Sequence, residues 1–414
     1  MSINFRNAQL SELYDFQYGT GNTIENIGGE YPIYGSNGIV GFTNKFNSED
    51  APVIGHIGAY AGIVNWANGK HYVTYNGVIC KIKPNINPRF GYYALLNSKL
   101  QSRLRGSTQP FVSYDLLNEV KTYLPNRVVQ DKIAKVLSDL DAKIELNNKI
   151  NQELEAMAKT LYDYWFVQFD FPTPPSSTSG IVGKPYKSSG GKMVYNEELK
   201  REIPEGWEVK ELGELGEFKN GVNYNPSNPG EIACPIINVR NISASSFFVQ
   251  NEDLDIIYLS ESDVRNYSVS EESIIIARSG IPGATRLISD IAKNTLYCGF
   301  AIQYELINLR NKIPIFFFLK SLEEHIKSGS GGTILKNVNQ GILKALLICL
   351  PNNEELLIKF NRLIEPIFDK INNLKKQNQQ LSSLRDWLLP MLMNGQVASR
   401  ASATGESRAS ATEE

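Results

Sequence analysis

The sequence predicts an α+β protein built from one unit that occurs twice: a globular α/β domain followed by a long helix. We expect a pseudo-twofold repeat between the units and an antiparallel coiled coil formed by the two helices. Three observations support this prediction. Matching segments open and close both halves, short β-branched and aromatic runs fill each interior, and a heptad pattern follows each half.

The repeat is visible first in the segments that open and close the halves. AQLSELYDFQYGTG at 8–21 resembles KELGELGEFKNG at 210–221, and both run from spaced leucines into a glycine. Each half leaves its domain through an apolar strand that ends in Leu-Pro-Asn, at 124–126 and at 350–352. Between these ends lie short apolar runs interrupted by Gly, Asn and Pro, a pattern typical of strands joined by turns.

The halves differ in length in their interior. Leu10 matches Leu212 at an offset of 202 residues, whereas Leu124 matches Leu350 at an offset of 226, so the second domain carries 24 more residues. Two domains that share a scaffold but read different targets would show this pattern. Drift after a duplication would show it too.

A heptad pattern with alternating steps of four and three residues follows each Leu-Pro-Asn. The predicted seam of the first helix is Ile133, Leu137, Leu140, Ile144, Asn147, Asn151, Leu154, Ala158, Leu161 and Trp165. The predicted seam of the second is Leu356, Phe360, Leu363, Ile367, Lys370, Leu374, Gln377, Leu381, Leu384 and Leu388. Such spacing favours a coiled coil, although two separate amphipathic helices packed on their own domains remain an alternative. Pro366 should kink the second helix or delay its start.

Composition shifts set the expected boundaries. A stretch rich in Pro, Ser and Gly separates the halves, and the end of the chain contains SRASAT twice. The predicted segments are domain 1 at 1–125, the first helix at 126–170, a linker at 171–203, domain 2 at 204–351, the second helix at 352–397 and a disordered tail at 398–414.

Composition and charge exclude several classes of protein. The sequence shows neither an apolar run long enough to span a membrane nor a signal-peptide pattern, so we expect a cytoplasmic protein without a membrane partner. The four cysteines and three histidines are scattered, and they predict no metal site and no disulfide framework. The net charge of −2 is unusual for a nucleic-acid binder, so any DNA surface must be local or helped by a partner.

Catalytic motifs are absent from the sequence. There is no Gly-rich cofactor loop after a strand, no Asn-Pro-Pro-aromatic or Pro-Cys methyltransferase segment, no GxxxxGK[ST] phosphate loop and no Gly-x-Ser-x-Gly elbow. We therefore expect no catalytic residues in this chain.

Loops that mix Gly, amide, aromatic and basic residues are the chemically suggestive part of each domain. Such groups can reach base edges and phosphates. Each of them alone is better explained as a turn or surface residue, and only the set as a whole favours base contact. The candidates are Asn37, His56, Tyr60, Arg103, Arg105, Thr108 and Gln109 in the first domain, and Arg278, Ser279, Arg286, Lys336, Asn337 and Asn339 in the second.

Four segments then point to a known family. They are LEAMAKTLYDYWFVQFDFP at 154–172, GKPYKSSGGKM at 183–193, REIPEGWEVKELGEL at 201–215 and LSSLRDWLLPMLMNGQV at 381–397. With the order domain, helix, domain, helix, the chain resembles the specificity subunit of a type I restriction-modification enzyme. The resemblance covers the whole chain apart from the tail.

The resemblance implies two target-recognition domains that each read one half of a bipartite site in double-stranded DNA, with the helices as a spacer. About 35 to 40 helical residues span roughly 50 to 60 Å, which suits half-sites about one turn of DNA apart. It also implies two modification subunits that hold S-adenosylmethionine and methylate adenine, and restriction or motor subunits that use ATP and Mg²⁺. No cofactor is expected in this chain. The main alternative is a coiled-coil scaffold or adaptor with two ligand-binding domains and no DNA reading; a fused methyltransferase ranks third.

Overall fold

The structure is a computed structural model that describes residues 5–21, 26, 28–104, 110–173, 183–224, 230–249, 251, 254–327 and 338–396. Its contacts divide the chain into two compact units. Unit 1 is Met1–Asn148 with Lys376–Glu414, and unit 2 is Lys149–Lys375. Each globular part is thus grouped with one end of both long helices, a division that the sequence boundaries at 126 and 352 did not contain.

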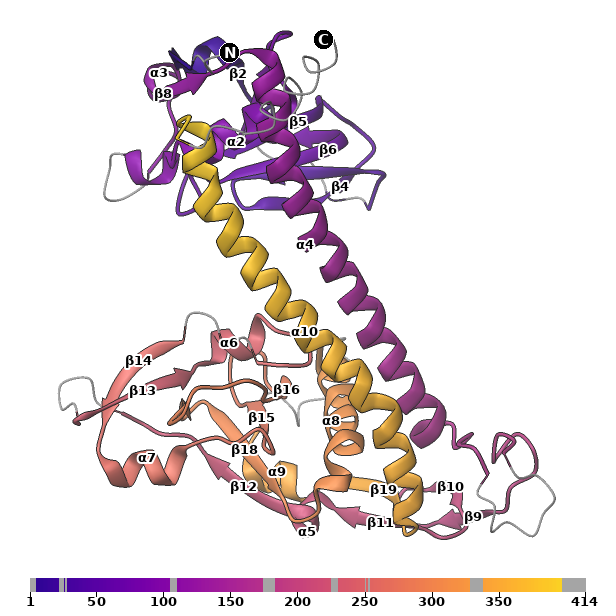
Figure 1. Cartoon of the computed structure of the whole chain (residues 1–414). Helices are drawn as coiled ribbons and strands as arrows, with labels where there is room; N and C mark the ends of the chain where they lie inside the picture. The colour runs from indigo at the N-terminus through magenta and orange to yellow at the C-terminus, as the bar shows by residue number, and fades with distance from the viewer. Residues whose placement is uncertain are drawn as a thin grey trace, which may run out of the picture. The chain divides into compact units, whose positions relative to one another are not determined.

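Unit 1 is organised around a six-stranded sheet with the order β2-β7-β5-β6-β3-β4 (Figure 1). Only the β3–β6 pair is parallel among its registered pairs. A separate ladder joins β1 to β8. The elements are β1 (Arg6–Gln9), α1 (Leu10–Leu13), β2 (Tyr14–Tyr18), β3 (Tyr31–Gly35), β4 (Gly38–Thr43), β5 (Ser48–Gly55), β6 (Val64–Val73), β7 (Gly77–Ile82), α2 (Pro88–Asn97), the 3₁₀ turn η1 (Leu100–Arg103), α3 (Tyr114–Glu119) and β8 (Lys121–Leu124).

The core of unit 1 forms where the short opening segment meets α2 and the first long helix, α4 (Arg127–Tyr162). Leu10 and Leu13 are fully buried with Phe90 of α2 and Leu137 of α4. Asn87 caps α2 by accepting a hydrogen bond from the Phe90 N–H (3.0 Å). The spaced leucines that revealed the repeat are therefore core residues.

Unit 2 repeats this scaffold in the sheet β12-β18-β15-β16, with a second sheet β14-β13-β17 beside it. Its elements are the π-helical turn η2 (Asp163–Val167), β9 (Met193–Asn196), β10 (Arg201–Pro204), β11 (Trp207–Glu211), α5 (Leu212–Leu215), β12 (Gly216–Asn220), β13 (Ile232–Ile237), α6 (Val239–Ser243), β14 (Asp255–Leu259), α7 (Glu261–Tyr267), β15 (Ile274–Ala277), β16 (Thr285–Leu287), β17 (Leu296–Tyr297), β18 (Ala301–Leu306), η3 (Leu309–Asn311), α8 (Lys312–Lys327), α9 (Gln340–Lys344), β19 (Leu347–Pro351) and the second long helix α10 (Glu354–Met393).

The extra residues of unit 2 lie mainly between the strands of one hairpin and just after it. In unit 1 the antiparallel strands β3 and β4 are joined by the two residues 36–37. In unit 2 the corresponding strands β13 and β14 are joined by 238–254, which contains α6, and α7 follows β14. The predicted α+β fold of two related domains and long helices is confirmed, and these loops explain where the offset between halves grows.

The long helices pair with each other inside each unit. In unit 1, Asp141 of α4 bonds to Arg385 of α10 (3.0 Å), and Asn147 bonds to Gln377 (2.8 Å), so the two segments run antiparallel. In unit 2, the Trp165 ring that follows α4 packs against Phe360 of α10. Of the two arrangements that the sequence left open, helix-to-helix pairing is the one observed.

The seam of α4 lies where the heptad pattern placed it. The structure buries or partly buries Ile133, Leu137, Leu140, Ile144, Asn147, Asn151, Leu154, Ala158, Leu161 and Trp165. Asn147 forms a polar layer, because its Nδ2 donates both to Gln377 Oε1 (2.8 Å) and to Asn378 Oδ1 (2.8 Å). The Asn151 side chain is also buried, and its Oδ1 has no hydrogen-bond partner within the described residues.

The predicted seam of α10 is wrong at three positions. Leu363, Lys370 and Leu384 are exposed. Gln377 is exposed too, but it accepts a hydrogen bond from Asn147 of α4. The remaining predicted residues are buried or partly buried, namely Leu356, Phe360, Ile367, Leu374, Leu381 and Leu388. Ile364, Ile371, Asn378 and Arg385 face inward in their place. A step of four residues followed by three, and a step of three followed by four, both fit a seven-residue repeat. The sequence pattern alone therefore did not decide which residues of α10 face inward. Pro366 lies inside a continuous helix and does not delay its start.

The predicted linker at 171–203 is partly wrong. Its described residues include the antiparallel hairpin of β9 and β10, and Phe171 is buried with its ring stacked on Trp207 (centroids 5.2 Å apart). The burial of aromatic rings therefore orders part of this segment, although its Pro, Ser and Gly content predicted a linker. The predicted tail at 398–414 lies outside the described residues.

Candidate nucleic-acid interface

In unit 1, a short loop follows β5 and returns to it. The Gly62 N–H donates to the Gly55 carbonyl (2.8 Å), and the Gly55 N–H donates to the Ile63 carbonyl (2.8 Å). His56 is the first residue of this loop, and its N–H donates to the carbonyl of Asn76, just before β7 (2.9 Å). Gly62 has φ +83°, a conformation that favours glycine.

Unit 2 contains the same arrangement after β15. The Gly283 N–H donates to the Ala277 carbonyl (2.8 Å), and the Ala277 N–H donates to the Ala284 carbonyl (2.9 Å). Arg278 is the first residue of the loop, and its N–H donates to the carbonyl of Phe300, just before β18 (2.8 Å). Gly283 has φ +81°, matching the conformation of its counterpart in unit 1.

A neighbouring strand extends the correspondence. The Thr74 N–H donates to Tyr34 O (3.0 Å) in unit 1, and the Cys298 N–H donates to Ile237 O (3.0 Å) in unit 2. These bonds continue the parallel pairs β3–β6 and β13–β17. His56 and Arg278 therefore occupy the same position of a duplicated scaffold.

Several candidates of unit 1 converge at this edge. Asn37 is exposed in the turn between β3 and β4, and the neighbouring Ser36 Oγ donates to Asn76 O (2.7 Å). Tyr60 lies in the loop after β5 and is 45% exposed. Arg103 lies on η1, where its Nε donates to Ser98 O (2.8 Å). Arg105, Thr108 and Gln109 lie outside the described residues.

Aromatic residues that sequence reasoning missed complete the edge of unit 1. Tyr18 stacks on His56 (centroids 4.3 Å apart) and on Tyr114 (4.0 Å), and burial raises the pKa of the Tyr18 phenol. A cavity of about 320 Å³ is lined by Tyr18, His56, Ile57, Tyr75 and Phe111. Phe111 is 55% exposed and Tyr75 is 44% exposed. They come from separate loops, so only the fold brings them together, although Tyr75-Asn76-Gly77 is recognisable in sequence as a turn.

The corresponding edge of unit 2 is more open. Arg278 and Ser279 are half-buried, and Phe300 is 63% exposed. Asn339 caps α9, because its Oδ1 accepts from the Ile342 N–H (3.0 Å). Lys336 and Asn337 lie outside the described residues.

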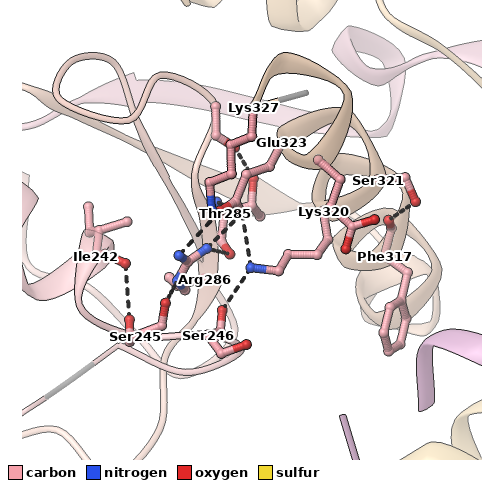
Figure 2. Close-up of polar contacts among 12 residues, drawn as sticks. Ile242, Ser245, Ser246, Thr285, Arg286, Phe317, Lys320, Ser321, Glu323 and Lys327 are labelled. Atoms are coloured by element: carbon pink, nitrogen blue, oxygen red, sulfur yellow. Dashed lines mark hydrogen bonds and ion pairs between the residues drawn. The ribbon is translucent and has the colours of Figure 1, made fainter. Parts of the chain in front are cut away.

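Arg286 is not a base-contact residue, contrary to the sequence prediction. It is 2% exposed in β16, and Figure 2 shows its guanidinium turned toward Glu323 of α8. Arg286 Nη1 lies 2.8 Å from Glu323 Oε2, and its Nε donates to Ser245 O (2.7 Å). The arginine is therefore occupied inside the unit, because a buried guanidinium requires a charged partner and hydrogen-bond acceptors.

Two lysines complete this buried cluster around Glu323. Lys320 Nζ lies 3.0 Å from Glu323 Oε2, and Lys327 Nζ lies 2.6 Å from Glu323 Oε1 (Figure 2). Burial raises the pKa of the Glu323 carboxyl, but Arg286, followed by Lys320 and Lys327, outweighs this effect and brings the pKa to about 2. Lys320 Nζ also donates to Ser246 O (3.1 Å), so the cluster fixes the loop after α6.

Within the described ranges, no group of three or more His, Cys, Asp or Glu side chains is placed to hold a metal ion. Nor does any helix in these ranges have the length and apolar character needed to cross a membrane. The four cysteines are free and buried.

A recognition scaffold that occurs twice, with loops of hydrogen-bonding and aromatic side chains, defines a two-unit recognition protein. The family described as type I restriction modification DNA specificity domain matches residues 5–156 and 204–383. The chain belongs to this family, as its sequence resemblance suggested. It is a DNA sequence-specificity subunit of the type I restriction-modification class, and the family match falls once on each half.

Individual relatives agree with the family. The chain is 29% identical over 336 residues to the type I restriction enzyme MjaIX specificity subunit of Methanocaldococcus jannaschii, covering 76% of this chain and 71% of the relative. It is 26% identical over 372 residues to the HindI specificity subunit of Haemophilus influenzae, covering 76% and 79%. A crystal structure of the type I S subunit from M. genitalium has the same fold (TM-score 0.55, 19% identity), covering 95% of this chain and 96% of that one.

Proposed function

We propose that each unit reads one half of a bipartite site in double-stranded DNA. The observation that supports this most directly is the duplicated loop, which presents His56 in unit 1 and Arg278 in unit 2 from the same place on the scaffold. Bases are distinguished by the hydrogen-bond donors and acceptors at their edges. Two related domains that recognise different DNA sequences therefore need the same backbone loop with different side chains on it.

Because the net charge of the chain is low, we expect partner subunits to supply part of the affinity for DNA. The chain carries 42 Lys and Arg against 44 Asp and Glu, so its own field does not attract phosphates strongly. Two modification subunits would supply positive charge and the adenine methylation chemistry, with S-adenosylmethionine bound there. Restriction or motor subunits would use ATP and Mg²⁺. This chain contributes recognition, and no catalytic residue is assigned to it.

The paired helices offer a surface for docking modification subunits. On α10, Trp387 is 57% exposed and Leu384 is 43% exposed, and on α4 Leu146 is 50% exposed and Val136 is 45% exposed. Exposed aromatic and large aliphatic side chains are typical anchors of protein interfaces. Trp387→Ala should weaken co-purification of the modification subunit, whereas Gln380→Ala, an exposed polar control on the same helix, should not. Equal co-purification of both variants with the subunit would refute this docking surface.

The helices would also set the distance between the half-sites. One extra heptad in each helix, inserted at matched places, keeps both seams in phase and adds roughly 10 Å of helix. The selected DNA should then keep both half-sites and gain about three base pairs between them, at about 3.4 Å per base pair. A change in half-site sequence at constant spacing would contradict a spacer role.

The test of the function itself is selection from a random duplex library. The chain, purified with its modification subunits, is incubated with the library, and bound duplexes are sequenced at two salt concentrations. We expect one motif of two fixed parts separated by a constant gap. Recovery of no bipartite motif would reject DNA reading and favour the scaffold or adaptor alternative.

A further inference from the structure

The duplicated loops hold the side chains of His56 and Arg278 as well as their backbone. In unit 1, His56 Nδ1 lies 2.9 Å from the carbonyl oxygen of Tyr75. In unit 2, Arg278 Nη1 donates to the carbonyl oxygen of Gly299 (3.2 Å). Tyr75 precedes Asn76, and Gly299 precedes Phe300, so the two carbonyls are equivalent. One backbone oxygen thus orients the side chain at the same position in both units.

The anchored side chains keep part of their hydrogen-bonding capacity for a ligand. His56 Nδ1 faces a carbonyl and must donate to it, so Nε2 of the neutral ring is an acceptor. Nothing in the described part of unit 1 bonds to Nε2. His56 is only 4% exposed, so a ligand reaches it through the cavity of about 320 Å³ that its ring lines beside Tyr75 and Phe111. For Arg278, the described residues of unit 2 bond only Nη1, which leaves the donors on Nη2 and Nε.

Resting on the proposed DNA-reading function, we propose that position 56/278 is the base-reading position of each unit. Arg278 presents a fork of donors that matches the O6 and N7 acceptors of guanine in the major groove. His56 presents a single acceptor, which matches the exocyclic amine of adenine or cytosine in that groove. The unit 2 half-site therefore contains a guanine read by Arg278, and the unit 1 half-site contains an adenine or cytosine read by His56.

The surroundings of the two side chains favour base contact over phosphate contact. A phosphate oxygen is an acceptor and cannot donate to His56 Nε2, whereas an exocyclic amine can. The rings of Tyr75 and Phe111 give the cavity beside His56 apolar walls. In unit 2, the exposed Phe300 ring follows the anchoring Gly299 and offers the same kind of apolar neighbour.

The test for unit 2 is motif selection from the duplex library with the whole complex. Arg278→Lys keeps the charge but removes the planar fork, so preference for guanine at one position of one half-site should fall by on the order of tenfold or more. The other half-site should be unchanged. Arg265→Lys serves as the matched control, because this exposed arginine of α7 pairs with Glu261.

The test for unit 1 uses two substitutions that separate anchoring from reading. His56→Asn retains a donor near Nδ1 for Tyr75 O and removes the Nε2 acceptor, so preference for adenine or cytosine should be lost at one position of the other half-site. His56→Gln places an amide near Nε2 and should retain part of that preference. Thermal unfolding checks that both variants fold. If His56→Asn alone is unstable, an unchanged motif in His56→Ala would overturn the assignment.

Failure of DNA reading and failure of the base-reading position give different outcomes in these experiments. If the wild-type complex selects no bipartite motif, DNA reading itself fails. If the wild type selects such a motif but Arg278→Lys and His56→Asn select the same one at every position, position 56/278 only anchors the loop and the inference is overturned. Loss of preference at one position in each half-site, with the rest of the motif retained, supports it.

Discussion

Unit 1 and unit 2 share the loop after β5 and β15 but differ in what covers the next strand. In unit 1, Asn65 of β6 pairs with Val53 and is half-buried. In unit 2, Arg286 of β16 pairs with Ile275 at the equivalent place and is fully enclosed. The segment 238–254, for which unit 1 has only a two-residue turn, supplies part of this cover.

The difference shows how the scaffold tolerates an insertion. The inserted segment contributes the buried Phe247 and Phe248, which pack against Phe316 and Phe368. Its carbonyls at Ser245 and Ser246 accept from the cations around Glu323. The inserted segment therefore has its own core and polar anchors, and the recognition edge retains its hydrogen bonds.

Removing Glu323 should have the largest effect on this comparison. Glu323→Ala leaves Arg286 buried without its charged partner, which costs about 3 to 5 kcal/mol. Hydrogen exchange followed by mass spectrometry should show faster exchange in peptides of β16 and α8, with unit 1 peptides unchanged. Glu324→Ala is the matched control, because its side chain is 50% exposed. Equal effects of the two variants would show that the cluster does not stabilise unit 2.

Acid should destabilise unit 2 more than unit 1, because only unit 2 contains the Glu323 cluster. The folded pKa of Glu323 lies at about 2, below its ordinary value of 4.5, so the folded state binds the proton less readily than the unfolded state. Its contribution is complete above about pH 4.5 and is lost as the pH falls toward 2. Protection of unit 2 amides, measured relative to their intrinsic exchange rate at each pH, should fall as the pH drops across this window. In Glu323→Gln this pH-dependent part should be absent; if it persisted unchanged, another carboxyl would be responsible.

Swapping the residues Gly55 and Ala277, which end β5 and β15, should have a moderate effect on stability and on half-site selection. Unit 1 has Gly55 where unit 2 has Ala277, and a Cβ on Gly55 would lie 2.2 Å from Tyr60 O. Gly55→Ala should displace the loop, cost about 1 to 3 kcal/mol and weaken selection of the unit 1 half-site. Ala277→Gly should cost only about 0.5 to 1 kcal/mol. Thermal unfolding and motif selection measure both, and an equally mild Gly55→Ala would mean that the loop adapts.

The polar layer of the helix pair should have the smallest effect. Asn147→Ala removes hydrogen bonds to Gln377 and Asn378, whose amides are exposed or half-buried and regain water, so the loss should be about 1 kcal/mol. Denaturant unfolding measures it, with Glu145→Ala as the exposed neighbour for comparison. A gain in stability would indicate that the layer is retained for register and not for stability.

The sequence by itself determined the duplication, the two long helices and the seam of α4. These features depend on local periodicity and on matching ends, which are visible in one dimension. It also pointed to His56 and Arg278, because their loops combine Gly with polar and basic residues. The sequence did not determine that the two side chains are equivalent.

Only the tertiary structure decided the rest, because each remaining question concerned which groups meet in space. Two phases of the α10 heptad fit the sequence, and packing against neighbouring residues buried Ile364 and Ile371 while exposing Leu363. Arg286 looked like a contact for DNA until Glu323, 37 residues later, enclosed it. The sequence around Arg286 does not show that this arginine is buried, because its partner Glu323 is brought to it only by the packing of β16 against α8.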